Sequence, residues 1–367
     1  MRFETPFFDA LQGRIRELGG LLNAHLHLDR AGTLELSPGA ERAASYLSLS
    51  AKHGLIPAIH NSHFYDPDNL RERTAGYLDH MQAVGTTRAD TVVDVTLDRI
   101  GTSAFDIFRS LAAERADTFK LCVGAYSPLG FTDAEPERWA LLESAATDAD
   151  FIGSLPERDD RVIYPDHIGY REHCRRILEL ARRLDKPLHI HVDQRNDPRE
   201  NGTEQVLDII REVGIVPEPD AEPWVWLVHV ISPSTYDESR FQHLADRLRD
   251  LNVGVICCPS AALSMRQLRP ILTPTGNCIA RILELLAAGI HVRLGSDNLC
   301  DVTSPAGTPD LLAEVFVLCN AVRFYDVDVL AHLAAGHRID EASRRRVRDH
   351  LGLDAREVGQ AIKQYDG

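Results

Sequence analysis

The sequence contains no apolar run that approaches the roughly 18 consecutive residues of a membrane-spanning helix. Its first residues, MRFETPFFDALQGRIREL, also lack the basic, apolar and small-residue zones of a secretory signal peptide. The seven cysteines form no CxxC pair, which argues against a cysteine-rich zinc knot and favours reduced thiols over a disulfide framework. We therefore expect a cytoplasmic protein without a membrane partner.

Basic residues are also outnumbered by acidic ones. The chain has 40 Lys and Arg against 55 Asp and Glu, a net charge of −15. Such a surface repels phosphate backbones, and only short basic runs such as 344-RRRVR-348 are present. These runs lie in helical patterns, where a solvated helix face is the simpler interpretation. We expect a small-molecule substrate and no nucleic-acid partner.

Short apolar runs recur along the chain and are rich in Val, Ile and Leu. The eight runs are 19-GGLLNAHL, 91-TVVDVTL, 119-FKLCVGAY, 150-DFIGSL, 187-PLHIHV, 224-WVWLVHV, 253-VGVICC and 290-IHVRLGSD. Segments with helical spacing separate them, among them 171-REHCRRILELARRL and 279-IARILELLAAG. Alternating strands and helices require a parallel sheet, and eight such units favour a closed (β/α)8 TIM barrel over an open sheet.

The domain organisation follows from this pattern. No GxGxxG or GxxxxGK[ST] loop follows the early runs, which weakens a nucleotide-binding alternative. The 367 residues are 44% hydrophobic, enough for a large core. We expect an α/β protein in which residues 1–325 form the catalytic barrel. Residues 326–367 are expected to form two or three helices packed on it.

Potential metal ligands occupy the ends of four expected strands, which is where barrels of this type place their chemistry. They are His25 and His27 on the first strand, His189 and His191 on the fifth, His229 on the sixth and Asp297 on the eighth. An HxH pair directs both imidazoles to one side of a strand. Taken alone, an HxH pair is also compatible with an exposed strand end, and His229 is also compatible with a histidine of the core. Their coincidence favours a metal site.

These residues resemble the amidohydrolase superfamily, and within it the cytosine deaminase branch, over nearly all of residues 20–325. The stretch HLHLD resembles the first-strand HxHLD motif of the family, and 187-PLHIHVDQ resembles its fifth-strand pattern. The sixth strand, 227-LVHVIS, and the long stretch 282-ILELLAAGIHVRLGSDNLCDVTSPAGTPDLL are also similar. The resemblance implies a TIM barrel of the metal-dependent hydrolase type.

The resemblance also implies a set of roles. His25, His27, His191 and Asp297 would bind the metal, and Asp297 would act as general base and then as general acid. His229 would hydrogen-bond the water that the metal activates as the nucleophile.

Two further expectations concern the metal site. Members with two metals bridge them with a carboxylated lysine, usually from the fourth strand, and 149-ADFIGSLPERDD has none. We therefore expect one divalent ion, Zn2+ or Fe2+. By strand alternation we expect His189 to face away from the barrel mouth when His191 faces in.

Gln194 departs from the family pattern. Cytosine deaminases have a glutamate there that passes a proton to the substrate ring, and a glutamine cannot transfer a proton at neutral pH. Another acid of the same loop, Asp193, Asp197 or Glu200, could replace it. Alternatively, the substrate needs no ring protonation, or the glutamine is an engineered replacement. We retain Gln194 as a catalytic candidate on the resemblance.

Substrate contacts are expected from residues near the strand ends, namely Tyr126, Ser127, Glu157, Asp94 and Asn298. Ordinary loop or core roles fit Ser127, Tyr126 and Asp94 equally well. The third-strand stretch 123-VGAYSPLGF lacks the glutamine with which a pyrimidine deaminase reads its base, which argues against cytosine itself. Only 24 residues precede His25 and the tail is helical, so we expect no small β-sandwich domain.

The sequence thus predicts a mononuclear metal-dependent amidohydrolase that hydrolyses a C–N bond of a small nitrogen-containing ring, in the manner of cytosine deaminase. One alternative is a ring-opening cyclic amide or imide hydrolase, which releases no ammonia. A non-catalytic metal- or ligand-binding barrel is another. Barrels of this kind often self-associate, which leaves room for a homo-oligomer.

Overall fold

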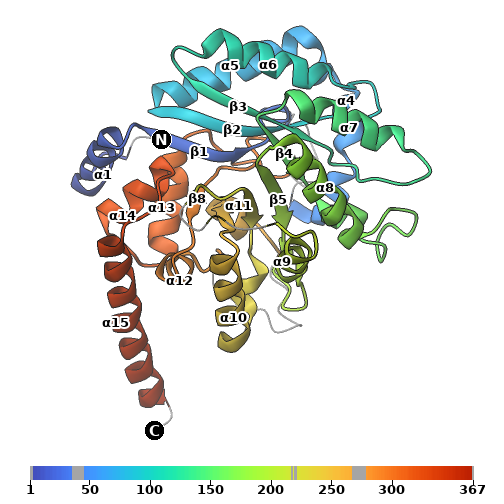
Figure 1. Ribbon diagram of the computed structural model, residues 1–367. Helices are drawn as coiled ribbons and strands as arrows, with labels where there is room; N and C mark the ends of the chain where they lie inside the picture. Colours follow the sequence, from blue (N-terminus) through green and yellow to red (C-terminus); the bar gives the residue numbers. More distant parts are fainter. Residues whose placement is uncertain (1–2, 35–44, 216–217, 219–220, 267–277, 366–367) are drawn as a thin grey trace.

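The computed structural model describes residues 3–34, 45–215, 218, 221–266 and 278–365. Within these ranges the strands form one parallel sheet in the order β1 to β8 (Figure 1). The strands are β1 Leu21–Leu26, β2 Thr86–Asp94, β3 Lys120–Tyr126, β4 Phe151–Ser154, β5 Leu188–Val192, β6 Val225–His229, β7 Gly254–Cys257 and β8 Val292–Leu294. Each strand falls within or overlaps one of the eight apolar runs. The predicted (β/α)8 barrel is confirmed.

The barrel closes between β1 and the residues that follow β8. The Asp297 N–H donates to the His25 carbonyl over 3.0 Å, and the His27 N–H donates to the Asp297 carbonyl over 3.3 Å. This close approach requires Gly295, because a Cβ atom there would lie 2.9 Å from the backbone of His25. The backbone bonds that complete the sheet therefore involve the same residues as the expected metal site.

Helices alternate with the strands and surround the barrel (Figure 1). The longer ones are α1 Pro6–Glu17, α5 Pro67–Ala83, α6 Ser103–Arg115, α7 Glu137–Asp148, α8 Tyr170–Leu184, α9 Gly202–Glu212, α10 Glu238–Asp250, α13 Leu311–Ala321, α14 Val327–Ala335 and α15 Glu341–Tyr365. Short helices in the loops are α3 Leu49–His53, α4 Ile56–His60, α11 Pro259–Leu263, α12 Ile282–Ala287 and the 3-10 turns η1 His63–Tyr65, η2 Pro156–Asp159 and η3 Ser232–Thr235.

The helix α8 shows why these segments form helices. Its buried residues include Cys174, Ile177 and Ala181, which recur at the three- and four-residue spacing of one helix face. On the exposed face Arg175 pairs with Glu172 and Glu179, both over 2.7 Å. One face thus packs on the sheet while the other is solvated.

The strands divide their side chains between the helical layer and the barrel interior. In β5, Leu188 and Ile190 join the large core beneath the helices, whereas His191 lines a cavity at the barrel mouth. The strand β2 begins at Thr86, before the apolar run that starts at Thr91. Its first half carries a buried carboxylate, Asp90, held by Arg88 over 2.8 Å, so apolar patterning could not place its start.

The C-terminal segment contributes two helices beyond α13. Helix α14 packs against α1, β1 and β8, and α15 packs against α12 with Val347 buried. The rest of α15 extends away from the barrel (Figure 1). The division at residues 325 and 326 stays a prediction. In the described part of the chain, no helix has the length and apolar character needed to span a membrane.

Candidate functional site

Four side chains meet where β1, β5 and β8 end. The Nε2 atoms of His25 and His191 lie 3.0 Å apart. Oδ1 of Asp297 lies 3.3 Å from Nε2 of His27 and 3.8 Å from Nε2 of His25. His229 joins them at the end of β6, within 4.8 Å of the His25 and His191 donor atoms. All five side chains are buried.

This donor set fits one divalent ion. With Zn–N bonds of roughly 2.0–2.1 Å, the ligand atoms of a tetrahedral site lie about 3.3 Å apart, close to the spacings seen here. Burial, reinforced by the neighbouring imidazoles, lowers the pKa of His25 and lowers that of His191 to about 3. Both rings are therefore neutral and keep a lone pair for a metal. The buried Nδ1 atoms of His25 and His229 have no hydrogen-bond partner among the described residues. An ion or a water molecule could supply the missing interaction.

Backbone strain marks the same strand ends. His229 has a φ angle of 81° and Asp297 one of 59°, and Asp193 after β5 has 54°. Positive φ is uncommon for non-glycine residues and is adopted most readily by Asp and Asn, so the clearest sign of an enforced backbone is the value at His229. The fold therefore holds His229 and Asp297 in orientations that relaxed strands would not give.

Neighbouring groups fix the ligand rings. Nδ1 of His191 donates to the Ser154 carbonyl over 2.9 Å, which leaves Nε2 free to face the cavity. The guanidinium of Arg30 lies against Nδ1 of His27. Because a guanidinium only donates, this contact keeps the ring proton on Nε2, and a cation at that atom must displace it.

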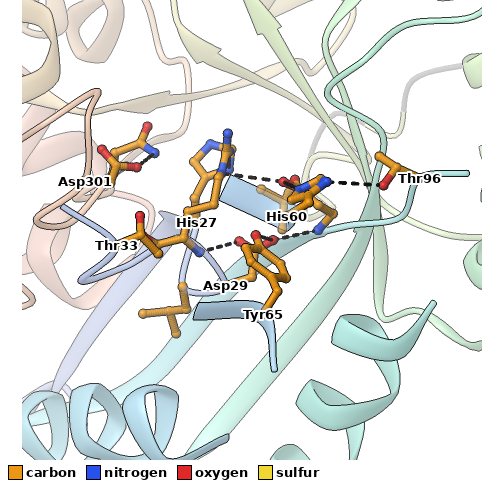
Figure 2. A network of polar contacts seen from close by, with 12 residues as sticks. His27, Asp29, Thr33, His60, Tyr65, Thr96 and Asp301 are labelled. Atoms are coloured by element: carbon orange, nitrogen blue, oxygen red, sulfur yellow. Dashed lines mark hydrogen bonds and ion pairs between the residues drawn. The ribbon is translucent and has the colours of Figure 1, made fainter. Parts of the chain in front are cut away.

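Behind His27 lies a buried polar network. Asp94 accepts from Nε2 of His60 over 3.0 Å and lies 3.7 Å from Nε of Arg30. The Tyr65 hydroxyl and the Asp94 N–H both donate to Oδ2 of Asp29, over 3.0 and 2.9 Å (Figure 2). Asp94, expected to contact the substrate, therefore lies in the network that supports Arg30 and His27.

The candidate metal ligands border a narrow cavity at the barrel mouth. Of the sequence-predicted residues, Tyr126, Gln194, His229 and Asn298 line it together with His27, His191 and Asp297. Asn298 is held by a hydrogen bond from Nδ2 to Oδ2 of Asp301 over 2.5 Å. Ser127 is buried beside Tyr126 but is not part of this lining.

Two further cavity residues, Arg30 and His53, were missed from the sequence. His53 ends the short helix α3, and its pKa is lowered to about 3 by burial, with Arg30 and Arg158 adding to the shift. The sequence contains features that could have indicated both residues. Arg30 directly follows HLHLD, and the segment between β1 and β2 is far longer than a plain βα connection, as in loops that cover active sites.

Gln194 contacts an acid from the neighbouring strand end. Its Nε2 donates to Oε2 of Glu157, in the turn η2 after β4, over 3.2 Å. Oε1 of Glu157 is buried and has no partner among the described residues. Burial raises the pKa of Glu157 to about 8, with the Glu200 carboxylate adding to the shift and Arg195 opposing it. The carboxyl group is therefore largely protonated at neutral pH.

The three acids of the β5 loop are engaged elsewhere. Asp193 accepts from the backbone N–H groups of Gly202 and Thr203, over 2.6 and 2.9 Å, at the start of α9. Asp197 pairs with Arg199 over 2.6 Å and Glu200 with Arg195 over 2.7 Å. These contacts give each a structural role, and Glu157 is the acid that faces Gln194.

The expectation for His189 was wrong. His189 lies in the barrel interior, with its ring centroid 4.2 Å from that of Phe151 and 6.5 Å from that of His25. Residues two apart in a strand point to the same face, so His189 lies on the side of His191, one layer deeper. It belongs to neither group of converging donor atoms found among the described residues.

No protein-family model matches the sequence. A protein of Haemophilus influenzae, described only as uncharacterized, is 27% identical over 279 residues, which span 75% of this chain and 94% of that protein. The crystal structure of 5-methylcytosine deaminase from Klebsiella pneumoniae liganded with phosphonocytosine has a TM-score of 0.73 at 20% identity, covering 87% of this chain and 74% of that chain.

Two other solved structures are similar. N-isopropylammelide isopropylaminohydrolase from Burkholderia multivorans has a TM-score of 0.66 at 20% identity, covering 87% of this chain and 74% of that chain. Atrazine chlorohydrolase from Arthrobacter aurescens, complexed with zinc, has a TM-score of 0.57 at 17% identity, covering 83% of this chain and 64% of that chain. At these identities the likeness establishes a common barrel fold.

Proposed function

We propose that this chain is a metal-dependent amidohydrolase of the cytosine deaminase-like branch, which hydrolyses a C–N bond of a small nitrogen-containing ring. The observation that carries the proposal is the convergence of His25, His27, His191 and Asp297 at strand ends of the barrel. The fold it shares with 5-methylcytosine deaminase and N-isopropylammelide isopropylaminohydrolase supports the choice of substrate class.

These four residues would hold one ion, zinc or ferrous iron. The turn after β4 offers no lysine for bridging a second metal. When bound, such an ion lowers the pKa of a coordinated water towards neutrality and so supplies a nucleophile at neutral pH. Zinc is supported by the similar atrazine chlorohydrolase, which was solved with that metal.

The proton transfers belong to residues of this chain. The Asp297 carboxylate accepts a proton from the attacking water and returns it to the leaving nitrogen, which departs as ammonia or an amine. His229 is neutral because burial lowers its pKa, and it donates a hydrogen bond to the oxygen that attacks the ring carbon. The carbon thereby exchanges its bond to nitrogen for a bond to oxygen.

Glu157 takes the role of the glutamate that cytosine deaminases have at the position of Gln194. Its protonated carboxyl group gives a proton to the ring nitrogen and regains one from the new hydroxyl group as the carbonyl forms. Gln194 holds this carboxyl group through the bond to Oε2. Tyr126 and Asn298, which line the cavity, are assigned to substrate binding, and Asp94 positions His27 through Arg30.

The test is product analysis with the metal-loaded protein. The zinc and the ferrous forms are incubated with 5-methylcytosine, N-isopropylammelide and the cyclic imide succinimide. Release of ammonia or isopropylamine from a ring substrate supports the proposal. Ring-opened acid without ammonia favours the cyclic amide hydrolase instead. Tight metal binding without turnover of any ring favours a binding barrel.

A further inference from the structure

The metal cavity opens into a wider groove at the barrel mouth. Leu49, His53 and Met265 line both spaces, so the two are continuous. A substrate with its reacting carbon near Asp297 would extend its remaining part into the groove. The groove wall therefore indicates what the remote part of the substrate carries.

Three of the cations that line the groove, Arg158, Lys52 and Arg266, have no acidic hydrogen-bond partner among the described residues. The Arg158 guanidinium lies 4.5 Å from the centre of the Tyr164 ring and donates to its hydroxyl group, and its Nε is buried without a partner among the described residues. Lys52 donates to the Thr303 carbonyl over 3.2 Å. Arg266 donates to the Tyr46 carbonyl over 2.8 Å. In the described ranges these partners are all neutral.

Other arginines of the protein have acidic partners. Arg240 pairs with Glu204 over 2.5 Å, and Arg195, which also lines the groove, pairs with Glu200 over 2.7 Å. With a net charge of −15 the chain has carboxylates in excess for pairing. The cluster of unpaired cations at the mouth is therefore a local exception to the acidic surface.

The groove keeps its positive charge at neutral pH. Glu157 is the one acid among the described residues that line it, and its carboxyl group is largely protonated because its pKa is about 8. Burial lowers the pKa of Lys52, and the charge of Arg266 adds to this effect while the Asp301 carboxylate opposes it. Like charges are thus held together without a counter-charge from the groove wall.

We infer that the substrate carries an anionic group, a carboxylate or a phosphate, which binds to Arg158, Lys52 and Arg266 while its ring enters the metal cavity. Apolar side chains that line the same groove, among them Ile163 and Leu47, fit an uncharged spacer. Guanidinium groups bind carboxylate and phosphate oxygens through paired hydrogen bonds, and a positive mouth on an acidic protein also attracts anions. The assignment of the ring to the metal cavity rests on the proposed function.

The test measures binding, so it does not require turnover. Benzoate, phenyl phosphate and the neutral benzamide are titrated calorimetrically into the metal-loaded protein. Benzoate or phenyl phosphate should bind at least about tenfold more tightly than benzamide, and the stronger of the two identifies the anion class. Equal affinity for benzoate, phenyl phosphate and benzamide would overturn the inference while leaving the proposed hydrolysis untouched.

Variants separate the groove from the metal, which can itself bind anions. Arg158→Gln and, independently, Arg266→Gln should weaken anion binding about tenfold, the usual size for one charge-assisted contact, with metal content unchanged. The matched control is Arg356→Gln on the exposed part of α15, which should leave binding as it is. Anion binding that survives both groove substitutions would place the anion at the metal and refute the groove site.

Discussion

Nε2 of Gln194 donates a hydrogen bond to Oε2 of Glu157 over 3.2 Å and so joins the loop after β5 to the turn after β4. The pair lies where the metal cavity meets the outer groove. Gln194 cannot transfer a proton, whereas burial keeps Glu157 protonated at neutral pH. A proton donor absent from one strand end is therefore present at the neighbouring one.

Replacing Glu157 by glutamine should lower kcat by about 10² to 10⁴, the usual cost of losing a general acid. Metal content should not change, because Glu157 is not among the converging donor atoms. Steady-state kinetics at pH 7 on a ring substrate that the protein turns over measure the loss. Glu143→Gln on the exposed face of α7 is the matched control. A kcat within threefold of the unaltered protein would remove Glu157 from the mechanism.

The dependence of kcat on pH should also reflect the protonation of Glu157. Glu157 acts in its protonated form, which is present below its pKa of about 8 and is lost above it. We therefore expect kcat to fall as the pH rises through about 8. This limb should disappear in Glu157→Gln. If the variant keeps an unchanged alkaline limb, another group must be responsible for it.

The two histidines of β5 should differ in their effect on the metal. His191→Ala removes a converging donor atom and should abolish stoichiometric zinc binding. His189→Ala removes a side chain from the layer below and should leave the zinc content near one per chain. Elemental analysis of both purified variants decides the matter. Equal loss of zinc in both would place His189 among the ligands.

Arg30 should influence metal affinity through His27. Arg30→Met removes the guanidinium that lies against Nδ1 of His27, so that Nδ1 can carry the ring proton and Nε2 can present its lone pair. Zinc binding should therefore tighten by roughly tenfold, the lower end of the effect that groups around a ligand have on metal affinity. Competition with a chromogenic chelator gives the dissociation constant. Arg88→Met, which breaks the buried pair with Asp90 at the far end of the barrel, is the control for general destabilisation. Zinc affinity that is unchanged or weaker in Arg30→Met would contradict this role.

The fold could be predicted because its signal is repeated. Eight apolar runs separated by helical segments leave few arrangements other than a closed parallel barrel, and each run corresponds to an observed strand. The prediction failed only for the start of one strand. The start of β2 was missed because Arg88 and Asp90 satisfy each other inside the barrel, so the strand carries charge where apolar residues were expected.

The residues of the candidate site likewise fall into those that could be predicted from the sequence and those that could not. His25, His27, His191, His229 and Asp297 could be predicted because strand ends of a barrel converge by geometry. His53, Arg30 and the contact of Gln194 with Glu157 depend on how separate loops pack over the mouth, which no local pattern encodes. His189 was misplaced by an error in strand periodicity, since it shares the face of His191.

Hydrolysis of a ring C–N bond at this metal site is tested by comparing ammonia or amine release by the metal-loaded protein with release by Asp297→Asn carrying the same metal. Asp297 supplies both a donor atom and the proton transfer, so each preparation is first matched for bound zinc. We expect stoichiometric release of ammonia or amine from a nitrogen-containing ring by the unaltered protein and a loss of at least about 10² in rate in the variant. Equal release by both proteins, or none by the unaltered protein with zinc or ferrous iron across such rings, would contradict it.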